Sequence, residues 1–344
     1  MINRFRLTPA SPVITPLMSD TLFGHFCWAV LYRSGENYLE ELLANFAKGK
    51  PAPVLFSSAF PTGYLPRPTI PPLGRNRLTQ LVHKHFGKSK KAEFEGFMRA
   101  KALSKKRLLK LEQWHRLKAG YSEEKILDEF LQQGTSTREP IGEDEVSTSN
   151  TINRISGTVA EGGGVFAREK TWYREGTQFD LYVSVNLPEL QDLVVWFLLE
   201  FLPENGFGAD KSIGMGRFNT AVDSSFTADE FDTIEGNARL SLSLCSFNNM
   251  GSYKVFYRLR TKFGKLGGNF AVFSPTGGKP RPFKKPILMY EPGAVFLMSE
   301  SLEDRPLLEG IHSDTRIRHC GVPITVPFKL LEDMSDALNA NETR

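Results

Sequence analysis

Short segments in which hydrophobic and polar residues alternate occur along the whole chain, and this pattern is typical of β-strands. The first segment covers residues 2–7, and the most regular one covers residues 179–185. Further strands are predicted in both halves of the chain, at 54–57, 218–222, 240–247, 254–261, 287–290, 295–298 and 324–328.

Apolar residues at helical spacing predict two helical regions in the first 225 residues. Ser19 and Asp20 stand where a helix N-cap belongs, and a helix is expected to follow them and to end at Gly35. A second, short helix is expected at 39–46. The clearest amphipathic helix is expected at 187–202, ended by Pro203.

The middle of the chain has a different character. Residues 76–133 are rich in lysine and permit helix formation, so we expect an inserted helical segment. Residues 133–150 are polar and without periodicity, which predicts a mobile linker. Residues 151–175 predict an irregular β-hairpin whose tip carries the glycines at 162–164. Strands and helices mixed over both halves indicate an α+β fold class.

Charge is distributed unevenly along the 344 residues. Residues 84–118 hold twelve Lys/Arg and three acids, a net +9, and residues 258–285 hold eight Lys/Arg and no acid, a net +8. The whole chain carries only +4, so the remainder carries −13. Such segregation favours a polyanionic partner, because each neutralised phosphate releases counterions; the alternative is a solvated basic helix face.

A glycine-rich loop is the most informative local feature, with the sequence NGFGADKSIGMGRF at 205–218. Its glycines allow positive φ angles and a close approach of the backbone to a ligand. Successive amides of such a loop can point at phosphate oxygens, with Lys211 and Arg217 adding charge. The spacing matches neither a Walker A motif nor a dinucleotide fingerprint. An ordinary helix–strand turn remains the alternative.

Candidate catalytic and metal-binding residues are few. His25 is a candidate general acid or base, or else a histidine that orients a loop or stacks on a base. His312 and His319 match no familiar metal signature. Three cysteines without a CxxC pair suit a reducing cytoplasm. The sequence has no long apolar run and no signal-peptide core, so we expect a cytoplasmic protein without a membrane span. No motif for a metal or a cofactor is found, so neither is expected.

The predicted hairpin combines arginines with aromatic residues, among them Arg154, Arg168 and Phe166. Arginine beside aromatic rings suits stacking against unpaired bases. The alternative is an edge hairpin whose aromatic residues fill the core.

Several of these segments, in their order, resemble the RAMP superfamily, and in particular the subunits that cap the guide RNA in type III-A (Csm) CRISPR effector complexes. The resemblance extends over nearly the whole chain. The similar segments are SDTLFGHFCWA at 19–29, LFSSAFP at 55–61, YLPRP at 64–68, INRISGT at 152–158, GFGADKSIGMGRF at 206–218 and NFAVFSPTGGKPRPFKKPILMYEPGAVF at 269–296.

The resemblance implies two ferredoxin-like (RRM-like) domains, at 1–225 with the helical insertion and a thumb hairpin, and at 226–344. It also implies a non-catalytic subunit that binds the 5′ handle of the guide RNA and bridges a large polymerase-like subunit to a backbone RAMP subunit. The implied RNA-binding residues are Ser19, His25, Arg67, Asn153, Arg154, Arg168, Lys211, Ser212, Ile213, Gly214, Met215, Gly216 and Arg217.

The chain departs from the family pattern at three positions. Asn153 replaces the usual Asp, Ser156 the usual Thr, and Ala294 a common Ser. Three alternatives to this function stay open. They are a guide-processing endoribonuclease that uses His25, another structural RAMP subunit, and a metabolic α+β enzyme with an incidental basic patch.

Overall fold

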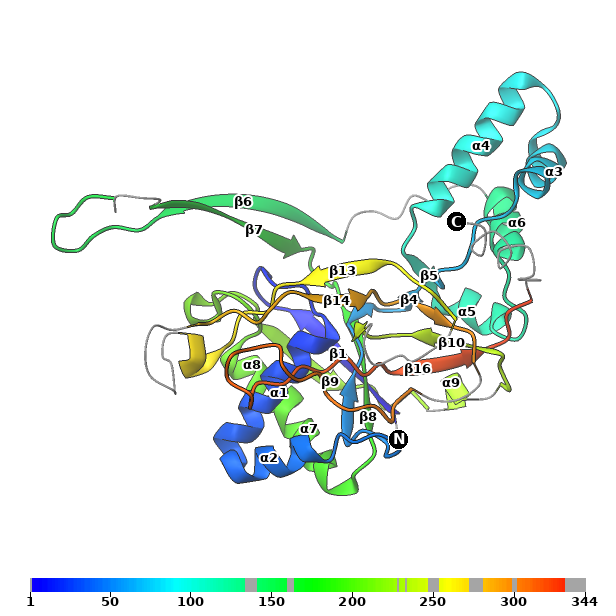
Figure 1. Ribbon diagram of the computed structural model, residues 1–344. Helices are drawn as coiled ribbons and strands as arrows, with labels where there is room; N and C mark the ends of the chain where they lie inside the picture. Colours follow the sequence, from blue (N-terminus) through cyan, green and yellow to red (C-terminus); the bar gives the residue numbers. More distant parts are fainter. Residues whose placement is uncertain are drawn as a thin grey trace.

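The computed structural model describes residues 2–133, 141–159, 164–227, 229–232, 234–246, 254–271, 281–298 and 302–331. Helices and strands are mixed along the chain, as the α+β class requires. A body of sheets and helices carries two projections, a helical one and a long hairpin, which leave it in different directions (Figure 1). Within the described residues, no helix is both long enough and apolar enough to cross a bilayer.

The principal sheet has the strand order β2-β8-β1-β9, with β3 also paired to β8. Its strands are β1 (Ile2–Pro9), β2 (Val54–Phe56), β3 (Phe60–Pro61), β8 (Phe179–Val185) and β9 (Phe218–Val222). Every pairing is antiparallel. All seven residues of β8 are buried, including Asp180 and Ser184, so its alternating polar residues lie inside the protein and not at the surface.

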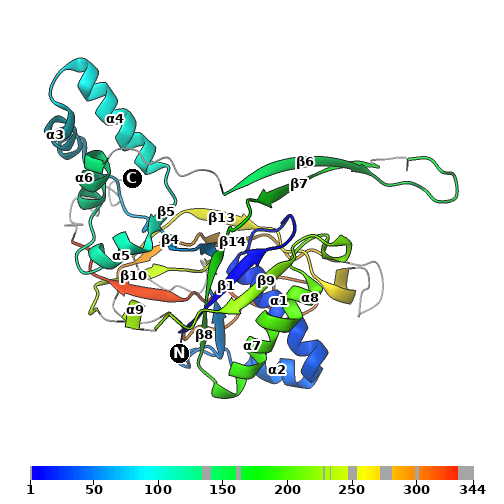
Figure 2. The ribbon, with the colours of Figure 1, turned by 180° about the vertical axis from the view of Figure 1, so that it is seen from behind.

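Helices α1 (Ser19–Ser34) and α2 (Glu36–Ala44) connect β1 to β2, and a longer helical region connects β8 to β9 (Figure 2). Helix α1 begins with Ser19 itself and its N-cap is Met18, so the predicted cap was displaced by one residue. The fold of this part is therefore a β-α-β-β-α-β unit, in which both helical connections flank the same sheet.

The predicted 187–202 helix is built from four pieces: a 3-10 turn (Pro188–Leu190), α7 (Gln191–Trp196), a π-helical turn (Phe197–Phe201) and α8 (Leu202–Asn205). The prediction that Pro203 ends it was wrong. A proline is tolerated in the first turn of a new α segment, where its missing amide has no partner to lose. Gly206, with φ +72°, ends the helix instead.

The predicted helical insertion contains α3 (Arg75–Phe86), α4 (Lys90–Ser104), β5 (Leu108–Lys110), α5 (Leu111–Leu117) and α6 (Glu123–Gln133). Helices α3 and α4 project from the body, whereas β5 pairs with β4 (Tyr64–Pro66) (Figure 1). Trp114 of α5 is fully buried against Phe328. The inserted segment is therefore not wholly peripheral, because α5 is part of the core.

The hairpin is longer than predicted and starts earlier. Strand β6 (Gly142–Asn150) lies in the segment expected to be a mobile linker, and it pairs in register with β7 (Val165–Tyr173). Most of β6 is exposed on both faces, so its sequence has no need of hydrophobic alternation. Residues 134–140 of the predicted linker and 162–163 of the predicted glycine tip lie outside the described residues.

The C-terminal half forms two smaller sheets, with strand orders β12-β15-β10-β16 and β11-β14-β13. The predicted strand at 240–247 is divided into β10 (Ala238–Ser241) and β11 (Cys245–Ser246), and that at 254–261 into β12 (Val255–Phe256) and β13 (Leu259–Lys262). Strands β14 (Ile287–Tyr290), β15 (Val295–Phe296) and β16 (Thr325–Phe328) match their predictions closely.

One hydrophobic core joins the two halves of the chain. It includes Phe5, Leu7 and Phe26 from the N-terminal half together with Leu240 and Phe328 from the C-terminal half. Helix α9 (Asp229–Asp232) lies between the halves in sequence. Packing is thus continuous across the boundary that the sequence suggests near residue 225.

Candidate nucleic-acid interface

The glycine-rich loop at 206–217 is held by the proline-rich loop at 10–18. The amide of Gly216 donates to the carbonyl of Pro12 at 2.8 Å, and that of Ala10 donates to the carbonyl of Arg217 at 2.8 Å. The amide of Ala209 donates to Thr15 Oγ1 at 3.0 Å. We call these two loops, with His25 of α1 and the base of β7, the junction.

Two glycines of the junction are required by close packing. A Cβ on Gly216 would lie 2.0 Å from the carbonyl oxygen of Phe207, and one on Gly208 would lie 2.4 Å from Thr15 Cβ. Both residues also have positive φ, +66° and +78°. Glycine is therefore needed here for contact between the two loops, whether or not a ligand binds.

Most amides of the glycine-rich loop have acceptors within the protein. Seven of its amides donate hydrogen bonds to other groups of the protein, namely those of Phe207, Gly208, Ile213, Gly214, Met215, Gly216 and Arg217. The amides of Asp210, Lys211 and Ser212 form no hydrogen bond to a described residue. An anion at this loop would therefore meet these three amides, because the amides of the glycines already have acceptors within the protein.

His25 is an internal acceptor. Its Nε2 accepts the Gly208 amide at 3.0 Å, and its ring lies 4.9 Å from that of Phe207. Burial, followed by the positive charge of Lys211, lowers the pKa of His25 to about 3. The imidazole is consequently neutral at physiological pH, and its acceptor nitrogen is occupied, which leaves it poorly placed to move a proton.

Lys211 and Arg217 have different environments. The Arg217 guanidinium donates to the carbonyls of Pro203 and Glu204, at the end of α8. Lys211 is half-buried, and its ammonium forms no ion pair with a described carboxylate. Burial and the nearby Arg217 lower the pKa of Lys211. Lys211 is thus the loop cation that an external anion can reach.

The hairpin joins the junction at its base. Val13 and Thr171 exchange backbone hydrogen bonds of 3.0 and 2.9 Å. Arg168 of β7 forms an ion pair with Asp210, the single described non-glycine residue with positive φ, and lies over the ring of Phe166 at 4.8 Å. Asp210 therefore links the glycine-rich loop directly to the hairpin.

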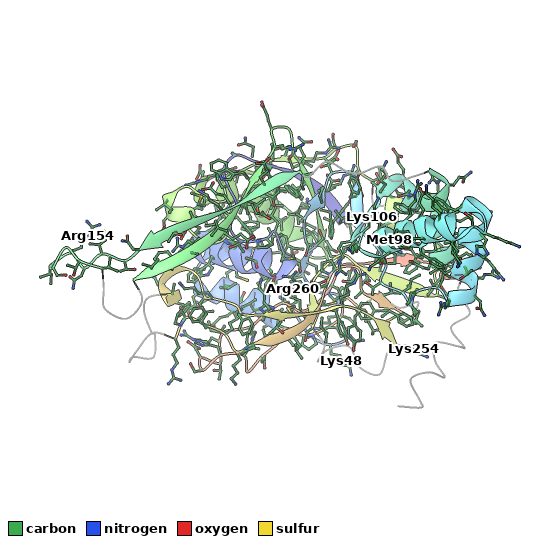
Figure 3. All side chains as sticks on the ribbon, turned by 90° about the horizontal axis from the view of Figure 1, so that it is seen from above. Lys48, Met98, Lys106, Arg154, Lys254 and Arg260 are labelled. Atoms are coloured by element: carbon green, nitrogen blue, oxygen red, sulfur yellow. The ribbon has the colours of Figure 1, made fainter. Side chains whose placement is uncertain are left out.

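Asn153 and Arg154 lie at the outer end of the hairpin. Asn153 Oδ1 accepts the Ile155 amide at 2.9 Å, which forms a local turn. Arg154 lies at the end of the projecting arm (Figure 3), and Ile155 beside it is 99% exposed. The predicted hairpin residues are consequently divided between the tip and the junction.

Ser19 and Arg67 do not reach the junction surface. The Ser19 hydroxyl accepts the Leu244 amide at 2.9 Å, and its side chain is buried. Arg67 is buried, donates to the Leu103 carbonyl at 2.8 Å and pairs with Glu123. Both hold distant segments together, so we assign them structural roles. Sequence reasoning missed Thr15 and Asp210; the prolines on both sides of Thr15 mark its loop, and Asp210 lies inside the glycine-rich loop.

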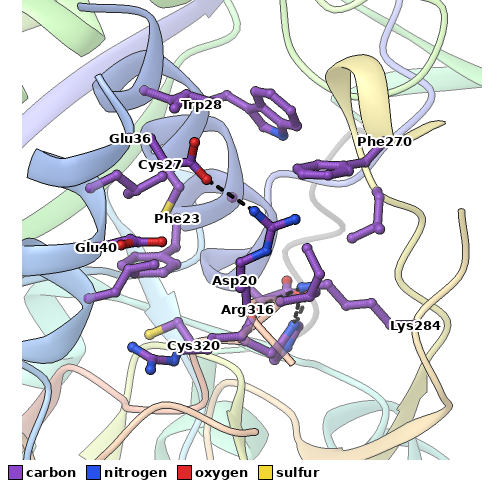
Figure 4. Close-up of a pocket in the computed structure, with 18 of the residues that line it drawn as sticks. Asp20, Phe23, Cys27, Trp28, Glu36, Glu40, Phe270, Lys284, Arg316 and Cys320 are labelled. Carbon is purple, nitrogen blue, oxygen red and sulfur yellow. Dashed lines mark hydrogen bonds and ion pairs between the residues drawn. The ribbon is translucent and has the colours of Figure 1, made fainter. Parts of the chain in front are cut away.

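A separate cavity of about 390 Å³ lies between α1, α2 and loops of the C-terminal half (Figure 4). Its walls are largely apolar, and Trp28 lies 5.7 Å from Phe270. At its floor, Asp20 pairs with Lys262 at 3.0 Å and approaches His319 at 3.6 Å. Burial, then the charge of Lys284, lowers the pKa of His319 to about 3. Within the described residues, no cluster of three His, Cys, Asp or Glu side chains could hold a metal ion.

No family model matches the sequence, and no curated protein matches it. Solved structures of similar fold exist. A chain of the Csm1–Csm4 cassette bound to one ATP is 17% identical, with 96% of this chain and 100% of that chain covered and a TM-score of 0.53. A chain of the same cassette with pppApApA is 15% identical, with the same coverage and a TM-score of 0.54.

A chain of the Csm3–Csm4 subcomplex of the type III-A CRISPR-Cas interference complex is 14% identical. The alignment covers 95% of this chain and 99% of that one, with a TM-score of 0.53. The RAMP-like resemblance seen in the sequence is thus confirmed at the level of the fold.

Proposed function

We propose that this chain, which shares its fold with chains of two Csm assemblies, is a non-catalytic subunit of a type III-A CRISPR effector complex. Csm4 is the component that the Csm1–Csm4 and Csm3–Csm4 structures have in common, and the likeness covers those chains almost completely. By analogy, this chain would contact both a large polymerase-like subunit and a backbone RAMP subunit.

Its role within the complex is to bind the 5′ handle of the guide RNA. The observation that carries this proposal is the junction, where the glycine-rich loop, α1 and the hairpin are fastened together by internal hydrogen bonds. The half-buried Lys211 ammonium and the amides of Lys211 and Ser212, which have no acceptor among the described residues, are the groups of the loop that an RNA phosphate would contact. Single-stranded RNA is recognised by such cations and amides together with stacking surfaces.

The strand order of the principal sheet supports a ferredoxin-like identity for the N-terminal unit. We extend this assignment to the residues after 225 as a second domain of the same ancestry. The shared core then represents a tight interface between the two domains.

The alternative, a guide-processing endoribonuclease using His25, is less well supported. A general base requires a free lone pair within reach of the substrate, and His25 Nε2 already accepts the Gly208 amide. Incubation of the purified protein with repeat RNA tests this point. Metal-independent cleavage that His25→Ala abolishes would establish the enzyme and overturn the non-catalytic assignment.

Handle binding is tested with Lys211→Ala and a matched control, Lys48→Ala, which removes an exposed lysine on the loop that follows α2. Lys211→Ala should weaken the binding of handle RNA and reduce the slope of log K against log salt by about 0.7, the value for one phosphate contact on a single strand. Lys48→Ala should leave both unchanged. Equal slopes for the two variants would exclude Lys211 from the interface.

A further inference from the structure

We propose that Lys106, Arg107, Lys110 and Arg258, which we call the cation cluster, form a second RNA-binding surface that contacts phosphates of single-stranded RNA without reading sequence. This surface lies outside the junction. It rests on the proposed function only in taking RNA as the polyanion.

The fold brings together two basic stretches that are distant in sequence. On one side, β4 pairs with β5 so that Tyr64 lies opposite Lys110, and the Arg67 amide donates to the Arg107 carbonyl at 2.9 Å. Lys106, Arg107 and Lys110 are all exposed along this two-stranded sheet. They belong to the stretch of net charge +9.

The other side comes from the stretch of net charge +8. The Thr69 amide donates to the Gly293 carbonyl at 2.8 Å, and a Cβ on Gly293 would lie 2.7 Å from the Arg67 carbonyl oxygen. The Glu291 amide donates to the Arg258 carbonyl at 2.9 Å. The end of β4 therefore packs on the turn that anchors Arg258, and the two basic stretches meet there.

Charges at this meeting point are not balanced. Arg67 pairs with Glu123, and Arg260 pairs with Glu291 at 3.1 Å. Within the described part of the chain, the four cations of the cluster form no ion pair with a carboxylate. Such a concentration of like charge opposes folding, and a bound polyanion would relieve the repulsion.

The surroundings of Lys106 and Arg258 lower the pKa of both side chains. Burial, followed by the charges of Lys110 and Arg67, lowers the pKa of Lys106. Burial, followed by Arg107 and Arg67, lowers the pKa of Arg258. Glu291 and Glu123 act on Arg258 in the opposite direction without cancelling the effect. These directions support the closeness that the backbone contacts establish.

The density of exposed cations favours RNA over an acidic protein. Lys101 near the end of α4 and Lys105 at its C-cap are exposed, and they directly precede Lys106. Several cations that follow one another closely along the chain suit contact with successive phosphates. Tyr257, next to Arg258, packs on Tyr290 with ring centroids 4.4 Å apart and is 41% exposed, so a base can stack on its outer face.

The surface is distinct from the hairpin tip. Lys106 lies at the foot of the helical projection, and Arg154 lies at the end of the hairpin on the opposite side of the molecule (Figure 3). An RNA bound both at the cation cluster and at the junction with its hairpin would be held at two separate places.

The experiment compares a triple variant, Lys106→Ala/Arg107→Ala/Lys110→Ala, with wild type in binding a long oligouridine that lacks a handle. The salt slope should fall by about 2, and the affinity should fall about 10-fold at low salt, because three phosphate contacts are lost. Arg258→Ala, on a different element, should reduce the slope by about 0.7.

A second triple variant, Lys88→Ala/Lys90→Ala/Lys91→Ala, removes the same charge from the α3–α4 connection and the first turn of α4 and is the matched control. It should change the affinity by less than about 2-fold. Equal losses in both triple variants, or no loss in the first, would overturn the proposal. Loss of a co-purifying acidic protein with unchanged RNA binding would overturn it as well.

The two proposals can fail separately. Lys211→Ala is tested on a handle-only oligonucleotide and the cation cluster on handle-free RNA. If Lys211→Ala weakens handle binding as expected while the triple variant binds oligouridine as tightly as wild type, only the second surface is rejected.

Discussion

The junction and the cation cluster are both rich in the residue types that bind RNA, yet their side chains are engaged very differently. In the junction, His25, Arg168 and Arg217 all have partners within the protein. In the cluster, none of the four cations has a carboxylate partner among the described residues, and Lys106 lies over the ring of Phe130 at 4.5 Å. Whether a side chain is free to bind a ligand therefore depends on its partners within the protein. Neither the residue type nor a sequence motif reveals these partners.

Trp114→Ala tests how much more the buried helix α5 contributes to stability than the projecting helix α4 of the same basic insertion. We expect it to destabilise the fold by about 4 kcal/mol, because a fully buried ring that contacts Phe328 is lost. Phe94→Ala on α4, where the ring is 68% exposed, should cost about 0.5 kcal/mol or less. Urea unfolding of both variants measures this. Similar losses in the free energy of unfolding would show that α4 contributes as much to the stability of the fold as α5.

Gly216→Ala tests whether the glycines of the junction serve packing. A Cβ there meets the Phe207 carbonyl, so we expect a loss of about 3 kcal/mol in the free energy of unfolding. Gly214→Ala is the control: φ is also positive, at +92°, but a Cβ would meet no atom within 4 Å. It should cost about 1 kcal/mol from backbone strain alone. Equal costs would mean that packing at Gly216 is unimportant.

The pH dependence of stability tests the role of His25. Its folded pKa of about 3 lies below the unfolded value, so its contribution is complete at neutral pH and is lost as the pH falls from about 6.5 towards 3. At pH 5 the loss is about 2 kcal/mol, because the unfolded state binds the proton. His25→Gln keeps an acceptor for Gly208 but does not titrate.

The measurement is thermal or urea unfolding of wild type and His25→Gln between pH 7 and 5. The variant should lose less stability over this range, while His319, whose pKa is also lowered, continues to contribute in both proteins. Identical pH profiles would show that His25 does not titrate in the way its burial and Lys211 require.

Separation of Arg168 from Asp210 should have the smallest effect on stability. The pair is partly exposed, and such ion pairs contribute about 0.5 kcal/mol. A double-mutant cycle with Arg168→Ala and Asp210→Asn measures the coupling. A coupling of several kcal/mol would place this pair with the buried interactions of the junction.

Much of the fold could be predicted from the sequence, because the strands that bury a face carry the signal. Strand β8, buried throughout, was predicted with its exact limits. Strand β6 was missed, because a hairpin arm exposed on both faces places no hydrophobic requirement on its residues. The predicted helix end at Pro203 was wrong for a different reason, because the sequence does not reveal the π-helical turn that precedes it.

The candidate site was predictable in composition but not in geometry. The glycine-rich loop and the hairpin do come together, through Asp210 and Arg168. Ser19 and Arg67 have partners 225 and 56 positions away, Leu244 and Glu123, and such pairings depend on the whole topology. The meeting of Arg107 with Arg258 was hidden for the same reason.

The β6–β7 hairpin is attached at its base, where Val13 and Thr171 exchange hydrogen bonds and Arg168 pairs with Asp210. Its two nine-residue strands extend about 30 Å from base to tip, at the usual rise per residue. Any change in the angle of the hairpin at this attachment would therefore displace Arg154 at the tip more than Arg168 near the base.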